Sequence, residues 1–206
     1  MEKRGAMSSP GRPRSFDKQK ALDAALQIFW RNGYEGTSTA DLIAAMGIEK
    51  PSMYAAFGNK EQLFRQVLDH YENGPAHLAS EALQEPTARR VIEHLMRASA
   101  DAGSDPHTPR GCLFVQGALA CGNDADCIRA ELISRRAAGE SGLRKRLQRA
   151  KREGDLPRTS DPAALARYVM AVLHGMSVRS SAGASRKELR GIAETALRGL
   201  RSELGA

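Results

Sequence analysis

Residues 38–57 decide the fold, and they read STADLIAAMGIEKPSMYAAF. Ser38, followed three residues later by Asp41, predicts a capping box at the start of a helix that Gly47 would end. Pro51 suits the first turn of a second short helix, because its missing N–H would have no helical partner there. The stretch therefore predicts two short helices joined by a turn.

The second of these helices has two different faces. Met53 and Phe57 would point inwards, whereas Ser52, Tyr54 and Ala55 would point outwards. Two short helices joined by a turn that includes glycine form a helix-turn-helix, and small outward residues let such a helix approach the major groove of DNA. Taken alone, the pattern also fits an ordinary helical hairpin.

Further helices are expected on both sides of this pair. Asp17 and Asn59 predict N-caps for a first and a fourth helix, and Gly74-Pro75 marks a boundary after the fourth. The helices expected beyond it span about 76–102, broken or kinked at Pro86, 109–122, 124–154, 161–182 and 185–203. We find no period-two strand pattern and no internal repeat, so the predicted fold is all-α.

The composition favours a nucleic-acid partner and a cytoplasmic location. The 206 residues carry a net charge of +7, and a basic chain commonly binds nucleic acid. Residues 1–15 are rich in Gly, Pro, Ser and Arg and are expected to form a flexible basic arm, whereas the basic cluster at 129–158 is interpreted as a solvated helix face. We find no signal peptide and no apolar run long enough to span a bilayer, so no membrane association is expected.

The stretch from Gly11 to Tyr71 resembles the TetR family of bacterial transcriptional repressors. The matching residues are Ala24 to Phe29, Gly33 to Ser38, Asp41 to Ile43, Ala45 to Ile48, Ser52 to Tyr54, Phe57 and Asn59 to Phe64. The rest of the chain is similar only in length and helical character. The resemblance implies a helix-turn-helix DNA-binding domain of three helices at residues 16–74. A helical ligand-binding and dimerisation domain would follow at residues 75–206.

The resemblance also implies which residues touch double-stranded operator DNA. They are Arg12 and Arg14 in a minor groove, Thr37 and Ser38 on phosphates, Lys50, Pro51, Ser52, Tyr54 and Ala55 on the recognition helix, and Lys60 at the start of the fourth helix. Tyr54 and Lys60 would contact phosphates. The alternatives are that Tyr54 is a rim residue, that Lys60 is merely solvated and that the arm is an unstructured tail. Many relatives have a His where this chain has Ala56, which leaves the end of the recognition helix apolar.

In the family, the C-terminal helices enclose an inducer pocket and form a homodimer. The expected pocket residues are Leu95, Met96, Leu113, Phe114, Gln116, Leu119, Met170 and His174. The expected interface residues are Leu165, Val169, Val172, Leu173, Met176, Leu189, Ile192, Ala193, Ala196, Leu197 and Leu200. The alternative for both sets is that they are plain core. The function implied is a repressor that binds a palindromic operator as a dimer and is released by a small-molecule inducer. Activation instead of repression remains open.

The three cysteines, Cys112, Cys121 and Cys127, allow several interpretations. They fit small buried apolar residues, a redox or electrophile sensor centred on Cys112, or, with the spacing least in its favour, a metal site. No metal and no cofactor is expected. We see no Gly-rich phosphate loop, no His-Glu-x-x-His motif and no nucleophile elbow, so an enzyme or a scaffold is the less favoured class of function.

Overall fold

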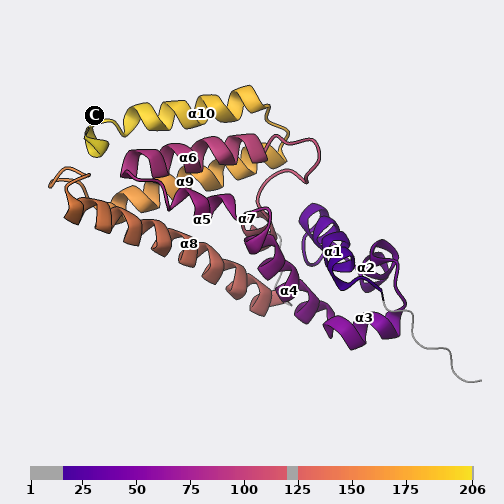
Figure 1. Ribbon diagram of the computed structural model, residues 1–206. Coiled ribbons are helices and arrows are strands. Elements are labelled where there is room, and N and C mark those ends of the chain that lie inside the picture. Colours follow the sequence, from indigo (N-terminus) through magenta and orange to yellow (C-terminus); the bar gives the residue numbers. More distant parts are fainter. Residues whose placement is uncertain (1–15, 120–124, 206) are drawn as a thin grey trace, which may run out of the picture.

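The computed structural model describes residues 16–119 and 125–205, without the side chains of residues 118 and 119. Throughout these residues the regular structure is helical and contains no strand, so the all-α prediction is confirmed. Helices α1 to α4 form one end of the molecule, and α6, α9 and α10 form layers at the other (Figure 1). The long helix α8 runs along both groups.

The N-terminal helices are α1 (Lys18–Asn32), α2 (Thr39–Met46), α3 (Lys50–Phe57) and α4 (Lys60–Asn73). The predicted caps are confirmed. Asp17 accepts hydrogen bonds from the first turn of α1, and Ser38 and Asn59 each form a capping box with the residue three positions later. Gly47 ends α2 in the left-handed conformation, with φ of 64°, which glycine adopts at little cost.

The C-terminal helices are α5 (Leu78–Ala82), α6 (Ala88–Ala102), α7 (Leu113–Leu119), α8 (Asp126–Glu153), α9 (Pro162–Ser181) and α10 (Arg186–Gly199), followed by the 3₁₀ helix η2 (Ser202–Leu204). The predicted break near Pro86 separates α5 from α6. The predicted helix start at residue 109 is wrong, because Gly111 has φ of 83° and α7 begins only after it. The predicted end of that helix lies outside the described residues.

Two hydrophobic cores hold the helices together, and α8 contributes to both. The N-terminal core is built around Phe29, Phe64 and Leu68 and also takes Leu113 from α7 and Leu132 from α8. The second core is formed by α6, the later turns of α8, α9 and α10. The division at residue 74 stays a prediction. Apolar side chains of α4, α7 and α8 pack in the same core across this division. A movement of α7 or α8 would therefore also disturb the packing of α4.

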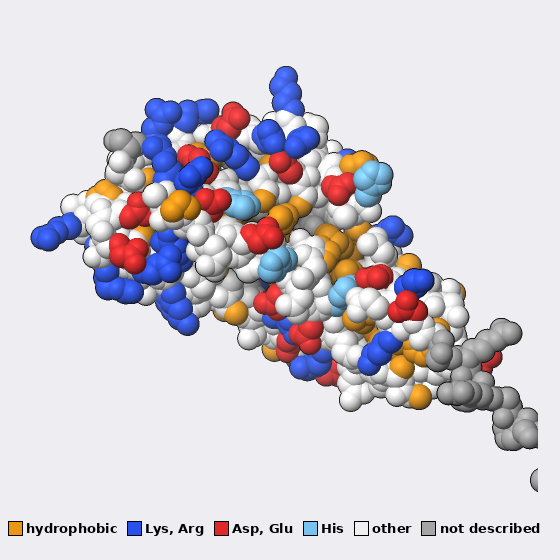
Figure 2. All heavy atoms as spheres, viewed as in Figure 1, with side chains coloured by type: hydrophobic (Ala, Val, Ile, Leu, Met, Phe, Trp, Pro, Cys, Tyr) orange, Lys and Arg blue, Asp and Glu red, His pale blue; other side chains and the backbone are white. Residues whose placement is uncertain are grey.

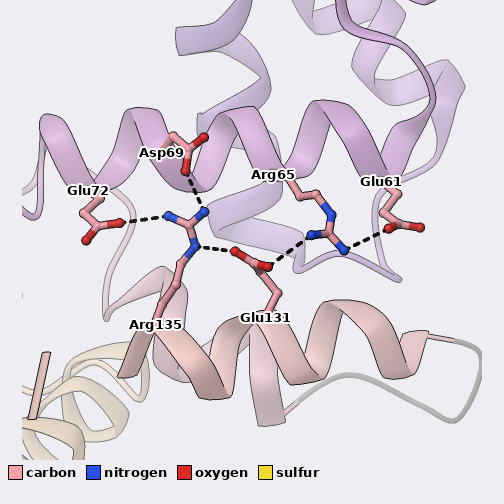
Figure 3. Close-up of polar contacts among 6 residues, drawn as sticks. All are labelled: Glu61, Arg65, Asp69, Glu72, Glu131 and Arg135. Atoms are coloured by element: carbon pink, nitrogen blue, oxygen red, sulfur yellow. Dashed lines mark hydrogen bonds and ion pairs between the residues drawn. The ribbon is translucent and has the colours of Figure 1, made fainter. Parts of the chain in front are cut away.

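An ion-pair network also joins α4 to α8 (Figure 3). The guanidinium of Arg135 on α8 binds Asp69 at 2.5 Å and Glu72 at 2.8 Å, both on α4, and Glu131 of its own helix at 2.9 Å. Arg65 of α4 contacts Glu131 at 3.1 Å. Because Arg135 is mostly buried and holds three carboxylates at once, the network fixes the position of α4 against α8.

Most of the other charged side chains lie on the surface of the molecule. Figure 2 shows Lys and Arg side chains gathered over the half of the molecule that contains α8 to α10. The exposed basic residues of α8 include Arg129, Arg144, Lys145, Arg149 and Arg152. Over residues 16–119 and 125–205, none of the helices has the length and apolar character that crossing a membrane needs. The same residues contain no group of three or more His, Cys, Asp or Glu placed to hold a metal ion.

Candidate nucleic-acid interface

The inward face of helix α3 is buried, and its outward face is exposed. Met53 and Phe57 are buried, as predicted, and the side-chain amide of Gln66 on α4 donates a hydrogen bond to the main-chain oxygen of Phe57 at 3.0 Å. Tyr54 is 45% exposed, and Ala55 beside it is exposed. The outward face of α3 therefore carries exposed side chains, and its C-terminal part combines one large polar residue, Tyr54, with the small Ala55.

The structure brings the expected DNA contacts of α3 together on this outward face. They are Lys50, Pro51, Ser52, Tyr54 and Ala55, of which Ser52 is half-buried and the others are exposed. Ser38 lies at the N-terminal end of α2, and Lys60 opens α4. A helix N-terminus presents free N–H groups and a positive dipole end, which favour phosphate. Arg12 and Arg14 lie outside the described residues.

Thr37 is placed differently from the sequence-based expectation. It is completely buried, and its hydroxyl donates a hydrogen bond to the main-chain oxygen of Gly33 at 2.7 Å. It therefore supports the turn between α1 and α2 and does not reach a phosphate in this conformation. A resemblance in sequence assigns a role to a position, but it does not report whether that side chain is at the surface.

Ser38 is exposed, and its side chain serves the start of α2. Its hydroxyl donates to the carboxylate of Asp41 at 2.7 Å and accepts the main-chain N–H of Asp41 at 3.1 Å. The hydrogen bond from the Ser38 hydroxyl, and then that from its main-chain N–H, lower the pKa of Asp41. Because the hydroxyl is already engaged on both sides, the first-turn N–H groups of α2 are the better phosphate donors at this end.

Two lysines lie over aromatic rings at this end of the molecule. The Nζ of Lys60 is 4.4 Å from the centre of the Tyr34 ring, and the Nζ of Lys18 is 5.1 Å from the centre of the Phe57 ring. Burial lowers the pKa of Lys60, and the carboxylate of Glu35 partly opposes this. The sequence analysis missed Lys18. Its position at the start of α1, directly after the basic arm, was the signal that could have found it.

The chain enters α1 beside the recognition helix. The ring of Phe16, the first described residue, lies 6.0 Å from that of Phe57 at the end of α3, measured between ring centres. The start of the described chain is therefore packed against the C-terminal end of α3, on its inward side.

Residues 21–67 match the family of bacterial regulatory proteins called tetR, and residues 87–196 match the tetracyclin repressor-like C-terminal domain. The chain belongs to the TetR family. It is 38% identical over 192 residues to the transcriptional repressor ComR of Escherichia coli K12, covering 92% of this chain and 91% of ComR. It is 31% identical over 163 residues to the regulator YezE of Bacillus subtilis 168, covering 77% of this chain and 83% of YezE.

Among solved structures of the family, this TetR chain is similar to the regulator CifR. A cysteine-substituted CifR in complex with 26-base-pair operator DNA is 38% identical and superposes with a TM-score of 0.87. The superposition covers 91% of this chain and 98% of CifR. The resemblance therefore extends over both predicted domains of the TetR fold, and the DNA-binding conclusion does not rest on the helix-turn-helix alone.

The expected ligand pocket is not assembled in this structure. Leu95 and Met96 are buried in the C-terminal core with Met170 packed against it, whereas Leu113 belongs to the N-terminal core, against which Phe114 packs. Two surface hollows are present, of about 310 and about 530 Å³, and neither is lined by an expected pocket residue. These five residues are thus split between two cores.

The remaining expected pocket residues have other surroundings. The side-chain amide of Gln116 donates to the main-chain oxygen of Arg110 at 2.8 Å, which ties it into the turn before α7. His174 is half-buried on α9; burial lowers its pKa, Arg136 lowers it further, and Glu140 raises it. The side chain of Leu119 lies outside the described residues.

The expected dimer stripes also need correction. Seven of their residues are buried in the C-terminal core of this chain itself, namely Leu165, Val169, Met176, Leu189, Ala193, Ala196 and Leu200. Val172, Leu173, Ile192 and Leu197 are only partly buried. A helical period shows which residues share a face, but not whether that face meets the chain's own core or a second copy.

The edge of these stripes is open, and three expected interface residues, Val172, Ile192 and Ala196, line a groove there. The groove, of about 530 Å³, lies between α9 and α10 and is lined by Tyr168, Val172, Arg179, Glu188, Gly191, Ile192, Thr195 and Ala196. Tyr168 is 45% exposed. The sequence analysis missed Tyr168 because its place one position before the buried Val169 puts it outside the apolar stripe.

Cys112 lies where the two parts of the molecule meet. It is half-buried, its main-chain N–H donates to the hydroxyl of Ser177 on α9 at 2.7 Å, and its thiol contacts the hydroxyl of Tyr71 on α4. Burial first, and then this thiol, raise the pKa of Tyr71. Cys127 is exposed, so it is not the small buried residue that the simplest interpretation expected. Cys121 lies outside the described residues.

Proposed function

We propose that this TetR-family regulator is a repressor that binds a palindromic operator as a homodimer and is released from it by a small-molecule inducer. The observation that carries the proposal is the open outward face of α3, held in place by the buried Met53 and Phe57. The similarity to CifR, whose solved chain is bound to operator DNA, and to ComR, which is named a repressor, supports it.

In this proposal, α3 lies in the major groove and two neighbouring helix ends bind the backbone. Lys60 and the first-turn N–H groups of α2 and α4 take phosphates, and Tyr54 reaches a further phosphate. The exposed Ala55 offers only a methyl group at the end of α3, which suits contact with a thymine methyl, whereas Ala56 packs against the N-terminal core. Phosphate contacts would then fix the position of α3, and its short side chains would read the bases.

We assign the homodimer to the open groove of α9 and α10. Tyr168, Val172 and Ile192 give this groove an apolar floor, with Arg179 and Glu188 at its edge. A two-fold interface places the same patch opposite itself, so an apolar centre with charges of both signs around it is self-complementary. Such a dimer presents two α3 helices to half-sites about 34 Å apart, one turn of DNA.

The turn before α7 offers a route from the sensor half to the DNA-binding helices. The N–H groups of Gly111 and Cys112 donate to Ser180 and Ser177 of α9, at 3.0 and 2.7 Å. The oxygen of Gly111 accepts from the indole of Trp30 on α1 at 3.1 Å. We consider two conformations, one that binds the operator and one in which α9 and this turn have shifted and the two α3 helices are wrongly spaced for it. A ligand that binds the second conformation more tightly acts as an inducer.

Fluorescence anisotropy with the DNA that precedes the chain's own gene tests the DNA contacts. Tyr54→Ala and Lys60→Ala should each weaken binding to every sequence. Lys60→Ala should also reduce the slope of log affinity against log salt by about 0.9, because it removes one cationic phosphate contact, whereas Tyr54→Ala removes a neutral one and should change the slope less. Lys145→Ala, an exposed lysine on α8, is the matched control and should change neither. Unchanged affinity for Lys60→Ala at moderate salt would reject the Lys60 contact.

Calorimetry tests induction for any candidate ligand. The coupling is reciprocal, so operator DNA must weaken the binding of an inducer by the same factor by which the inducer weakens DNA binding. Equal ligand affinity with and without the operator excludes that ligand as an inducer.

A second candidate function is electrophile sensing by Cys112, and its contacts with both α4 and α9 favour it. In the reaction with a maleimide, the thiol loses its proton and the sulfur adds to one carbon of the C=C bond. The π bond breaks, and the neighbouring carbon takes up a proton from water. The adduct would then occupy space against Tyr71 and disturb the turn before α7. The alternative is that Cys112 is a small packed residue with no sensing role.

The comparison that decides between these is Cys112→Ser against wild type, with and without a mild electrophile such as N-ethylmaleimide. Cys127→Ser is the matched control, because Cys127 is exposed and will react as well. Electrophile sensing predicts that the reagent releases wild type and Cys127→Ser from the operator but not Cys112→Ser. If wild type keeps the operator after mass spectrometry shows Cys112 modified, this second function is excluded.

A further inference from the structure

We propose that Tyr34 is a positioning residue for DNA binding: its ring holds the ammonium of Lys60 at the N-terminus of α4, where a phosphate of the operator binds. The inference rests on the proposed contact between Lys60 and the DNA backbone and goes beyond it. Tyr34 would act on DNA through Lys60.

The ring of Tyr34 is fixed by the N-terminal core. It is stacked on the ring of Phe29, with 6.2 Å between ring centres and 10° between planes, and tilted against Phe64 at 5.1 Å. Phe29 and Phe64 are completely buried, whereas Tyr34 is half-buried. One face of Tyr34 is therefore held by the interior of the domain, and the ring can serve as a rigid platform at its edge.

Lys60 uses that platform. Its Nζ lies 4.4 Å from the centre of the Tyr34 ring, within the range at which an ammonium is attracted to an aromatic face. An ammonium has three N–H donors, and a ring on one side leaves donors on the other side for an anion. Held in this way, the long side chain has fewer rotamers to lose when it binds a phosphate.

The surroundings of Lys60 suit an anion more than water. Lys60 is the first residue of α4, so its ammonium lies at the positive end of the helix dipole. Partial burial lowers the pKa of Lys60, which indicates that its charge has lost part of its hydration, and the nearby Glu35 only partly compensates. An operator phosphate would supply the missing counter-charge.

A double-mutant cycle on full-length protein tests the inference. Affinity for the operator fragment is measured at several salt concentrations for Tyr34→Phe, Tyr34→Leu, Lys60→Ala and the double variant Tyr34→Leu/Lys60→Ala. Tyr34→Phe keeps the ring and should bind within about twofold of wild type. Tyr34→Leu should bind about three- to tenfold more weakly, with a smaller salt slope, as expected for loss of a partly desolvated cation–π contact.

In the Lys60→Ala background, Tyr34→Leu should have no further effect on affinity. Additive losses in the double variant overturn the positioning role while leaving the Lys60 contact intact. No loss for Lys60→Ala overturns the inference together with that contact. No operator binding by wild type rejects the proposed function itself. These three failures are distinguishable in one set of titrations.

A second readout covers the case in which Tyr34→Leu alters folding, since Tyr34 contacts the core. NMR of the Lys60 side chain in the free protein should show ring-current shifts of the protons beside Nζ in wild type and in Tyr34→Phe that are lost in Tyr34→Leu, because the ammonium no longer lies over a ring. Tyr34→Met, which keeps bulk without a ring, replaces Tyr34→Leu if thermal unfolding shows that the leucine variant is not folded. Lys60 proton shifts that are the same in wild type and in the folded ring-free variant contradict the proposal.

Discussion

The indole N–H of Trp30 donates a hydrogen bond to the main-chain oxygen of Gly111, with 3.1 Å between nitrogen and oxygen. Trp30 lies on α1, and Gly111 lies in the turn before α7 whose own N–H binds Ser180 of α9. The ring of Trp30 also meets that of Tyr71 on α4 edge to face, at 4.8 Å between centres. One buried side chain therefore connects α1 with α4 and, through the turn before α7, with α9.

Trp30→Phe should lower the free energy of unfolding by about 1–3 kcal/mol. It removes the hydrogen-bond donor and leaves a small cavity, and each costs on the order of 1 kcal/mol in a buried site. Urea unfolding followed by circular dichroism measures this as a lower midpoint with an unchanged slope. A midpoint equal to that of wild type would show that the contact with Gly111 contributes nothing to stability.

The network around Arg135 should contribute more to stability than an isolated exposed ion pair, because the Arg135 side chain is mostly buried. Arg135→Met leaves the carboxylates of Asp69, Glu72 and Glu131 close together with less positive charge between them. We expect a loss of about 1–2 kcal/mol in unfolding free energy at low salt, because breaking one side of a shared network leaves like charges together. The loss should shrink as salt is raised.

Arg149→Met is the control for this change. Arg149 pairs with Glu153 on the same exposed face of α8, at 3.7 Å, and isolated surface pairs of this kind contribute about 0–0.5 kcal/mol. The two variants are compared by urea unfolding at low and high salt. Equal losses for both would mean that the α4–α8 network is no more than a set of surface pairs.

Asp101 makes folding stability depend on pH. Hydrogen bonds from Arg190, and then from Arg186, hold the pKa of this carboxyl well below its usual range. The ionised Asp101 makes its full contribution to the free energy of unfolding above the pKa of an aspartate in the unfolded chain, about 3.9. This contribution is lost as the pH falls through that value towards the lower folded-state pKa, because the unfolded chain takes up the proton first.

Asp101→Asn should therefore lower the free energy of unfolding at pH 6. The gap in unfolding free energy between the variant and wild type should become smaller as the pH is lowered from 5 to 3. Urea unfolding midpoints of both proteins over that pH range measure this gap. Other carboxylates, including Asp41, Asp161 and Glu188, also have lowered pKa values and stay in both proteins, so the difference isolates Asp101. A gap that stays constant with pH would contradict the assignment.

Features set by a few neighbouring residues could be predicted from the sequence. The caps at Ser38 and Asn59, and the helix end at Gly47, depend on contacts within three or four residues. The inward orientation of Met53 likewise follows from helical spacing. These local rules, together with the family resemblance, fixed the helix-turn-helix and the face of α3 that would meet DNA.

Features set by residues far apart in the chain could not be predicted. The start of α7 after Gly111 depends on contacts with α9 and α1, which no local pattern records. The stripe containing Val169 and Ala193 was assigned to a second copy, although these side chains fill the chain's own core. The expected pocket residues could not be assigned to one site for a similar reason, because Leu95 and Met96 belong to one core and Leu113 to the other.

The dimer face can be tested at Tyr168, which is 45% exposed and lines the open groove of α9 and α10. Tyr168→Glu should leave the monomer folded, because an exposed site tolerates a charge. In a two-fold interface the same change buries two like charges that face each other, so the variant should sediment as a monomer. Because a monomer binds only one half-site, the affinity for the operator should fall at least about tenfold.

Ile133→Glu, at a 49% exposed apolar residue on α8, is the matched control and should stay dimeric. If Tyr168→Glu sediments like wild type and keeps its operator affinity, the dimer forms through another face.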